Sequence, residues 1–170
     1  EYDYSYNGLA KIDYAFNERN TLSAHWFAGQ GNQVAPVGSS LFYYYEVAPI
    51  RVQNYALVYN HVISNSIANQ LLLGVNYFNQ VFNDLETDFD AASLCLVTGS
   101  NLLGAPNIKI TGFDPIGETP PEGRNDITGH LTDDLSWTVA RHQFKFGGEL
   151  RQSQLDEFYH RHALGSFTFD

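Results

Sequence analysis

The segment NGLAKIDYAF-NERN-TLSAHWFAGQ, residues 7–30, contains two stretches in which apolar and polar residues alternate, joined by four polar residues. The apolar residues at alternate positions are Ala10, Ile12, Tyr14 and Phe16 in the first stretch and Leu22, Ala24, Trp26 and Ala28 in the second. Successive side chains of a β-strand point to opposite faces, so each stretch predicts a strand with one apolar face. NERN is typical of a turn, and the segment therefore predicts an antiparallel hairpin.

The same pattern of two stretches around a short polar turn occurs twice more. The second pair occupies residues 51–63 and 68–82, and the third occupies residues 126–139 and 142–154. These stretches contain roughly 10 to 15 residues, whereas strands of globular proteins most often contain about 5 to 6. A strand that crosses a bilayer at an angle needs about 9 to 11 residues. The stretches are therefore long enough for the wall of a transmembrane β-barrel.

Long connections separate the three hairpins, over about residues 31–49 and 83–125. In outer-membrane barrels the short turns face the periplasm and the long loops face the outside of the cell. Loops of this length are usually functional or disordered. Contact with an extracellular ligand is the functional interpretation of these loops, and simple covering of the surface is the alternative.

The composition agrees with a membrane β-protein and argues against some partners. Aromatic residues make up 15% of the chain, and many lie near expected strand ends, as in the aromatic girdles of barrels. Aromatic residues are also common in soluble sheets, so this observation alone leaves both classes open. The net charge of -10 argues against a nucleic-acid partner, which requires a basic surface. The single cysteine, Cys95, has no internal disulfide partner and is interpreted as incidental. The alternative, a catalytic nucleophile, would require a histidine and an orienting group beside it, and the sequence does not place them there.

The strand count predicts a part of a barrel. We expect an all-β, antiparallel up-and-down meander of about six to eight long strands, forming a single unit over residues 1–170, with a seventh stretch near residues 164–169. Bacterial single-chain barrels use an even number of strands, from about eight upward. A smaller sheet would leave unpaired backbone groups in the bilayer. The sequence therefore predicts a segment of a larger outer-membrane β-barrel.

Several phrases of the sequence resemble those of a known family. YNGLAKIDY (residues 6–14) and NTLS (residues 20–23) resemble a strand and turn of TonB-dependent outer-membrane receptors, and LTDDLSWT (131–138) with RHQFKFGGELR (141–151) resembles their recurrent hairpin. The likeness is greatest to Oar-like receptors, which carry a carboxypeptidase-regulatory-like domain, and it covers most of residues 5–170.

The resemblance implies a location in the bacterial outer membrane and a role in nutrient uptake. It implies a 22-stranded barrel around an N-terminal plug, energised through a periplasmic partner. The expected partners are the lipid bilayer, the rest of the receptor barrel and plug, and an extracellular ligand. Residues 1–170 match neither the plug nor the energy-coupling box of the family, so no transport residue is assigned from the resemblance.

A metal site is the one cofactor site that the sequence suggests. In DEFYHRH, residues 156–162, an extended chain would place His160 and His162 on one face, where two imidazoles can bind a divalent metal. A further ligand would have to come from elsewhere, with His130 and His142 as candidates. The alternative interpretation is a polar strand end.

No catalytic residue is predicted, and the chain is more readily interpreted as a protein without enzymatic activity. Glu149 and Glu157 are the one pair of carboxylates considered for glycoside cleavage, but eight residues of strand span roughly 26 Å, which is too far. His25 and His61 are interpreted as polar residues of the barrel interior.

Two other functions are compatible with the sequence. One is a self-standing soluble β-protein or small metal-dependent enzyme, which would be soluble without detergent. The other is a structural or assembly protein that pairs through open strand edges, since such edges recruit further strands. The mass in solution distinguishes this assembly from a monomer.

Overall fold

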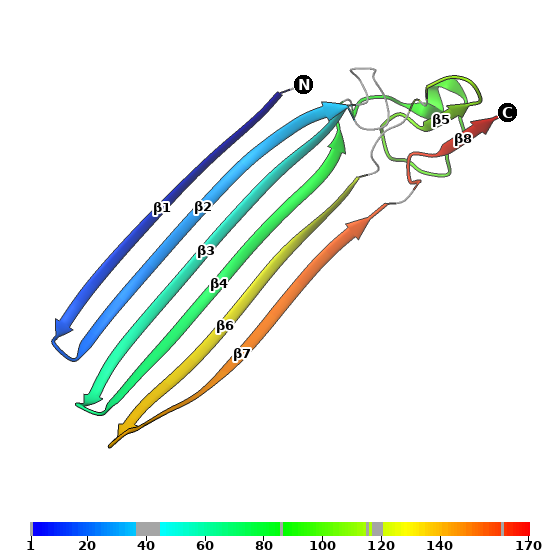
Figure 1. Cartoon of the computed structure of the whole chain (residues 1–170). Helices are drawn as coiled ribbons and strands as arrows, with labels where there is room; N and C mark the ends of the chain where they lie inside the picture. Colours follow the sequence, from blue (N-terminus) through cyan, green and yellow to red (C-terminus); the bar gives the residue numbers. More distant parts are fainter. Residues whose placement is uncertain (1, 37–44, 86, 115, 117–120, 161) are drawn as a thin grey trace.

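The computed structural model describes residues 2–36, 45–85, 87–114, 116, 121–160 and 162–170, and it confirms the all-β fold. Six long strands form one antiparallel sheet in the order β1-β2-β3-β4-β6-β7 (Figure 1). Their bounds are β1 Tyr2–Asn17, β2 Asn20–Pro36, β3 Tyr45–Ser64, β4 Ile67–Asp84, β6 Glu122–Val139 and β7 His142–Tyr159. Within the described ranges, no helix has the length and apolar character needed to cross a membrane.

The strands extend beyond the alternating pattern that predicted them. The connection expected over residues 31–49 is shorter, because β2 continues to Pro36 and β3 begins at Tyr45. Polar residues take part in this extension: Asn32 pairs with Pro49, and Gln33 pairs with Ala48. Backbone pairing continues where side-chain alternation has ended, so the pattern marks only part of each strand. Residues 37–44 lie outside the described part of the chain.

The three short turns occur where they were predicted. In the first, the Asn17 side-chain oxygen accepts hydrogen bonds from the Arg19 backbone N–H at 2.9 Å and from the Asn20 amide at 2.8 Å. In the third, Ala140 has a φ of 54°, in the left-handed region that such tight turns require. The turns therefore depend on short-range interactions of the kind that sequence can predict.

Successive hairpins are offset along the strands, as the stepped turns in Figure 1 show. Asn20 pairs with His61, three residues before β3 ends at Ser64. Ile67 pairs with Trp137, two residues before β6 ends at Val139. An offset of a little over one residue per strand, with a rise of about 3.3 Å and a strand spacing of about 4.8 Å, corresponds to a tilt of about 40°. Strands of outer-membrane barrels tilt by about 35–45°.

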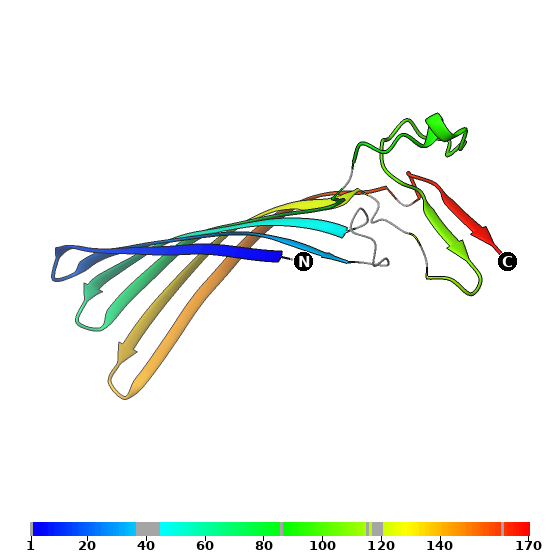
Figure 2. The same ribbon diagram turned by 90° about the horizontal axis from the view of Figure 1, so that it is seen from above.

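The long connection after β4 forms a small folded unit at the loop end of the sheet (Figure 2). It contains one 3-10 turn, η2 (Ala91–Leu94), and the strand β5 (Asn107–Ile110). The seventh stretch, expected near residues 164–169, is a strand, β8 (Ser166–Phe169), but it pairs in parallel with β5. The expectation that it continues the long meander is therefore wrong.

The chain leaves the main sheet because a turn follows β7. The backbone is left-handed at His162, with a φ of 55°, and at Gly165, with a φ of 91°. Leu164 between them is only 3% exposed and lies against Gly104. This packing holds β8 beside β5, and the alternating pattern of residues 164–169 contains no information about that contact.

Candidate functional site

The sheet has one apolar and one polar face, and the cross-strand register shows this directly. Directly paired residues lie on the same face of a sheet. One row of partners across the six strands consists of Ile12, Ala24, Leu57, Leu73, Leu131 and Leu150. The adjacent row consists of Lys11, His25, Ala56, Gly74, His130 and Arg151. We refer to the face of the first row as the apolar face and to that of the second as the polar face.

The apolar face has the height of a bilayer. Asn20 and Gln30 on β2 bound a stretch in which every residue of this face is apolar, and Asn69 and Asn79 do the same on β4. The bounding residues are ten positions apart on each strand, which corresponds to about 33 Å along the strand and about 25 Å after a tilt of about 40°. The apolar band of outer-membrane barrels is about 25 Å tall.

Polar side chains at the turn side of the apolar band bind one another. The Tyr59 hydroxyl donates to the Asn20 side-chain oxygen at 2.6 Å, and Nδ1 of His61 lies 2.5 Å from the same oxygen. The interpretation of His61 as an interior residue is wrong, because its partners Asn20 and Asn69 belong to the apolar face. Its spacing of two residues from Tyr59 was the sequence signal for this position. His25 does lie on the polar face, as expected.

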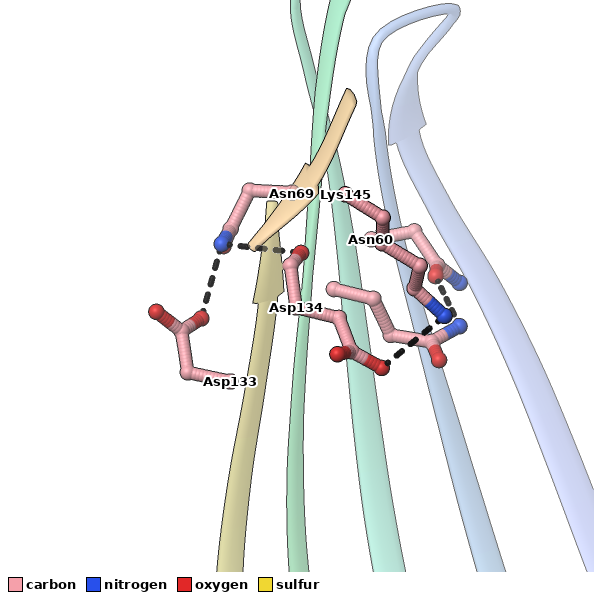
Figure 3. Close-up of polar contacts among 6 residues, drawn as sticks. Asn60, Asn69, Asp133, Asp134 and Lys145 are labelled. Carbon is pink, nitrogen blue, oxygen red and sulfur yellow. Dashed lines mark hydrogen bonds and ion pairs between the residues drawn. The ribbon is translucent and has the colours of Figure 1, made fainter. Parts of the chain in front are cut away.

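Asp133 and Asp134, adjacent residues near the turn end of β6, have side chains on opposite faces of the sheet (Figure 3). The Asn69 amide donates to Asp133 Oδ1 at 2.7 Å and to the Asp134 carbonyl at 3.2 Å. The Asp134 carboxylate forms an ion pair with Lys145 at 3.4 Å, on the polar face. Asp134 and Lys145 are in different strands, so only the hairpin register brings them together.

Several charged residues on the polar face form ion pairs. Three pairs join residues two positions apart on one strand: Lys11–Asp13 at 2.9 Å, Arg124–Asp126 at 2.7 Å and Glu149–Arg151 at 2.6 Å. Such residues share a face, so the spacing was a sequence signal that our prediction did not use. A surface of paired charges and amides can contact water, a polar solute or a polar protein surface.

His130 lies over a gap in the polar face that a glycine leaves. A Cβ atom at Gly74 would overlap the imidazole ring of His130. The neighbouring residue across β3 is Ala56, so the middle of the polar face has small side chains between His25 and His130. The glycine therefore leaves the space above β4 that the imidazole ring occupies.

We expect Gly74→Ala to destabilise the folded protein by about 0.5–1.5 kcal/mol, because the new methyl group pushes the His130 side chain out of its preferred rotamer. His130→Ala in the same chain should restore most of the loss. Gly129→Ala is the matched control, since a Cβ there meets nothing within 4 Å. Urea unfolding in lipid vesicles measures all three. Equal effects of Gly74→Ala with and without His130 would contradict this contact.

The structure separates the residues predicted for a metal site. His160 follows the end of β7 with its ring 5.6 Å from that of Phe158, and His162 lies in the turn beyond. His142 is at the opposite end of β7, about 59 Å along the strand, and His130 pairs with Arg151, about 30 Å from His160. Within the described ranges no three His, Cys, Asp or Glu side chains are grouped closely enough to hold a metal. A site at His160 and His162 stays a prediction that requires other ligands.

The other candidate catalytic residues, Glu149, Glu157 and Cys95, are also not grouped into a site. Glu149 and Glu157 lie eight residues apart on the polar face of β7, and Glu149 is paired with Arg151. Cys95 is exposed at the end of η2, with a φ of 60°.

A tilted sheet with an apolar face of bilayer height and a charged opposite face defines the wall of an integral outer-membrane protein. A protein-family model described as "Outer membrane beta barrel domain" matches residues 1–170. The chain belongs to this family, which confirms the predicted location in the bacterial outer membrane and the association with its bilayer. Neither the search of curated proteins nor that of solved structures returned a match.

Proposed function

We propose that the chain is a segment of the barrel wall of a TonB-dependent receptor that takes up a nutrient across the outer membrane. The main support for the proposal is the separation of the apolar face from the polar face, because a barrel wall needs an apolar exterior toward lipid and a polar interior. The hairpin phrases of residues 131–151 support the particular family. The folded connection with β5 and β8 lies at the loop end, where an extracellular ligand would arrive.

The edges of the sheet support a wall that continues on both sides. Within the described residues β1 pairs only with β2, and β7 pairs only with β6. Unpaired backbone groups in hydrocarbon cost several kcal/mol each. Further strands of the receptor would satisfy both edges, and its plug would contact the polar face. Exposed apolar residues such as Ile12 (69%) and Leu150 (70%) favour this arrangement over a self-standing soluble β-protein.

Uptake experiments on the full-length protein test the proposal. Cells that lack the gene should lose energised uptake of the nutrient, and so should cells that keep the gene but lack the periplasmic energy-coupling partner. Uptake that continues without this partner would contradict a TonB-dependent mechanism. The mass of the purified protein in detergent tests the alternative of edge-to-edge assembly. One copy in each particle is expected, and a sheet built from several copies of this chain would favour the assembly protein.

A further inference from the structure

The apolar face carries two adjoining grooves of different chemistry. The larger, of about 680 Å³, has the small residues Ala10, Ala24 and Gly129 between larger side chains such as Trp26 and Leu73. Its volume is within the range of about 300–1,000 Å³ typical of ligand sites. It lies in the middle of the apolar band, where lipid acyl chains surround the protein.

The smaller groove, of about 330 Å³, is polar and lies next to the first, on the loop side. Its side chains on this face include Tyr6, Gln30, Arg51 and Gln53. Gln53 and Tyr55 are alternate residues of β3, and the Tyr55 hydroxyl donates to the Gln53 side-chain oxygen at 3.3 Å. Tyr55 lines the apolar groove and Gln53 lines the polar one. The two grooves are therefore adjacent along β3.

The depth of the polar groove places it at the outer surface of the bilayer. Arg51 is 13 residues from Ser64, where β3 ends at its turn, which corresponds to about 33 Å of height at a tilt of about 40°. Gln30, which bounds the apolar band on the loop side of β2, pairs directly with Arg51, so Arg51 lies at the level of lipid headgroups. The short turns mark the periplasmic side, so these headgroups belong to the outer leaflet.

Arg51 is the residue that gives this surface a preference for negatively charged groups. It is exposed, and among the described residues no carboxylate forms an ion pair with it. The other arginines of the long strands, Arg124 and Arg151, face the polar side and are paired. A guanidinium with adjacent amides can bind a phosphate group through two parallel hydrogen bonds.

We propose that the apolar face of β1–β3 binds one phosphate-bearing glycolipid of the outer leaflet, with a phosphate at Arg51 and an acyl chain in the groove beside Trp26. Gln30 and Gln53 donate amide hydrogen bonds to the headgroup, and Tyr55 lies at the boundary between headgroup and chain. The site depends on the outer-membrane location of the protein and is independent of what the receptor transports.

Lipid titration of the full-length protein tests the site. Detergent-solubilised protein is titrated with diphosphorylated lipid A, with its dephosphorylated form and with phosphatidylethanolamine, and native mass spectrometry counts the bound molecules. We expect diphosphorylated lipid A to bind most tightly. Arg51→Gln should weaken its binding about tenfold or more, since a charge-assisted hydrogen bond is lost. The affinity of Arg51→Lys for this lipid should lie between those of the wild type and Arg51→Gln, because lysine keeps the charge but cannot form the two parallel hydrogen bonds.

Two further variants separate the site from general effects. Arg141→Gln removes the same charge at the third turn, on the opposite side of the membrane, and should leave lipid A binding unchanged. Ala24→Phe fills the floor of the larger groove and should weaken binding without a change in charge. Far-ultraviolet circular dichroism establishes that each variant is folded. Equal binding of lipid A by the wild type and Arg51→Gln would overturn the proposal, and so would equal binding of the three lipids.

Discussion

Leu73→Arg is expected to destabilise the folded protein by about 2–4 kcal/mol, because it places a charge near the middle of the lipid-facing band. Leu73 pairs with Leu57 and Leu131 on the apolar face and is 44% exposed on that face. In the bilayer its side chain contacts acyl chains, and an arginine there loses hydration. Urea titration of the full-length protein in lipid vesicles measures the loss.

The adjacent leucine is a control of identical residue type and nearly identical depth. Leu72 pairs with Val58 and Thr132 on the polar face, so an arginine there meets water and polar groups. Leu72→Arg should cost much less than Leu73→Arg. Similar losses for the two variants would show that the assignment of the faces is wrong, whatever the mechanism of the receptor.

Proline in β1 is expected to reveal whether the barrel wall continues past this strand. Successive N–H groups of a strand point to opposite edges, so one of Leu9 and Ala10 donates toward β2 and the other points away. Proline removes the donor and leaves the partner carbonyl unsatisfied in lipid, at a cost of about 3 kcal/mol. If β1 has neighbours on both sides, Leu9→Pro and Ala10→Pro should both destabilise the full-length protein by this amount.

The comparison between the two proline variants serves as its own control, because both change the same strand at the same depth. A free edge tolerates proline, so a normal unfolding curve for one of the two would mean that β1 is an edge strand. That result would contradict the proposed barrel segment and would leave the lipid site on β1–β3 untouched. The two proposals can therefore fail separately.

The sequence predicted the long strands and their turns because both depend on residues that are close together in the chain. Alternation places Leu22, Ala24 and Trp26 on one face of β2 whatever that strand pairs with. The Asn17 side chain binds the backbone two residues away. The predicted strands were too short, because β2 and β3 remain paired at Asn32 and Gln33, beyond the point where the alternating pattern ends.

Contacts between strands could not be predicted in the same way. The ion pair of Asp134 with Lys145 and the position of His130 over Gly74 both depend on the register between strands, and a shift of one residue would move every side chain to the other face. The expected metal site required residues 156–162 to stay extended, whereas β7 ends at Tyr159. His130 and His142 are distant from that end of the strand.

The sequence by itself determined that this protein is a sheet of long membrane-spanning strands with one apolar face, because alternation and turn chemistry are local properties. Only the tertiary structure decided which residues meet across that sheet. It paired β8 with β5 through the burial of Leu164, and it aligned Arg51 with the groove beside Trp26. These contacts join residues from separate strands or loops. They are determined by the register of the backbone hydrogen bonds and by the packing of the loop unit, and no local pattern of the sequence specifies either.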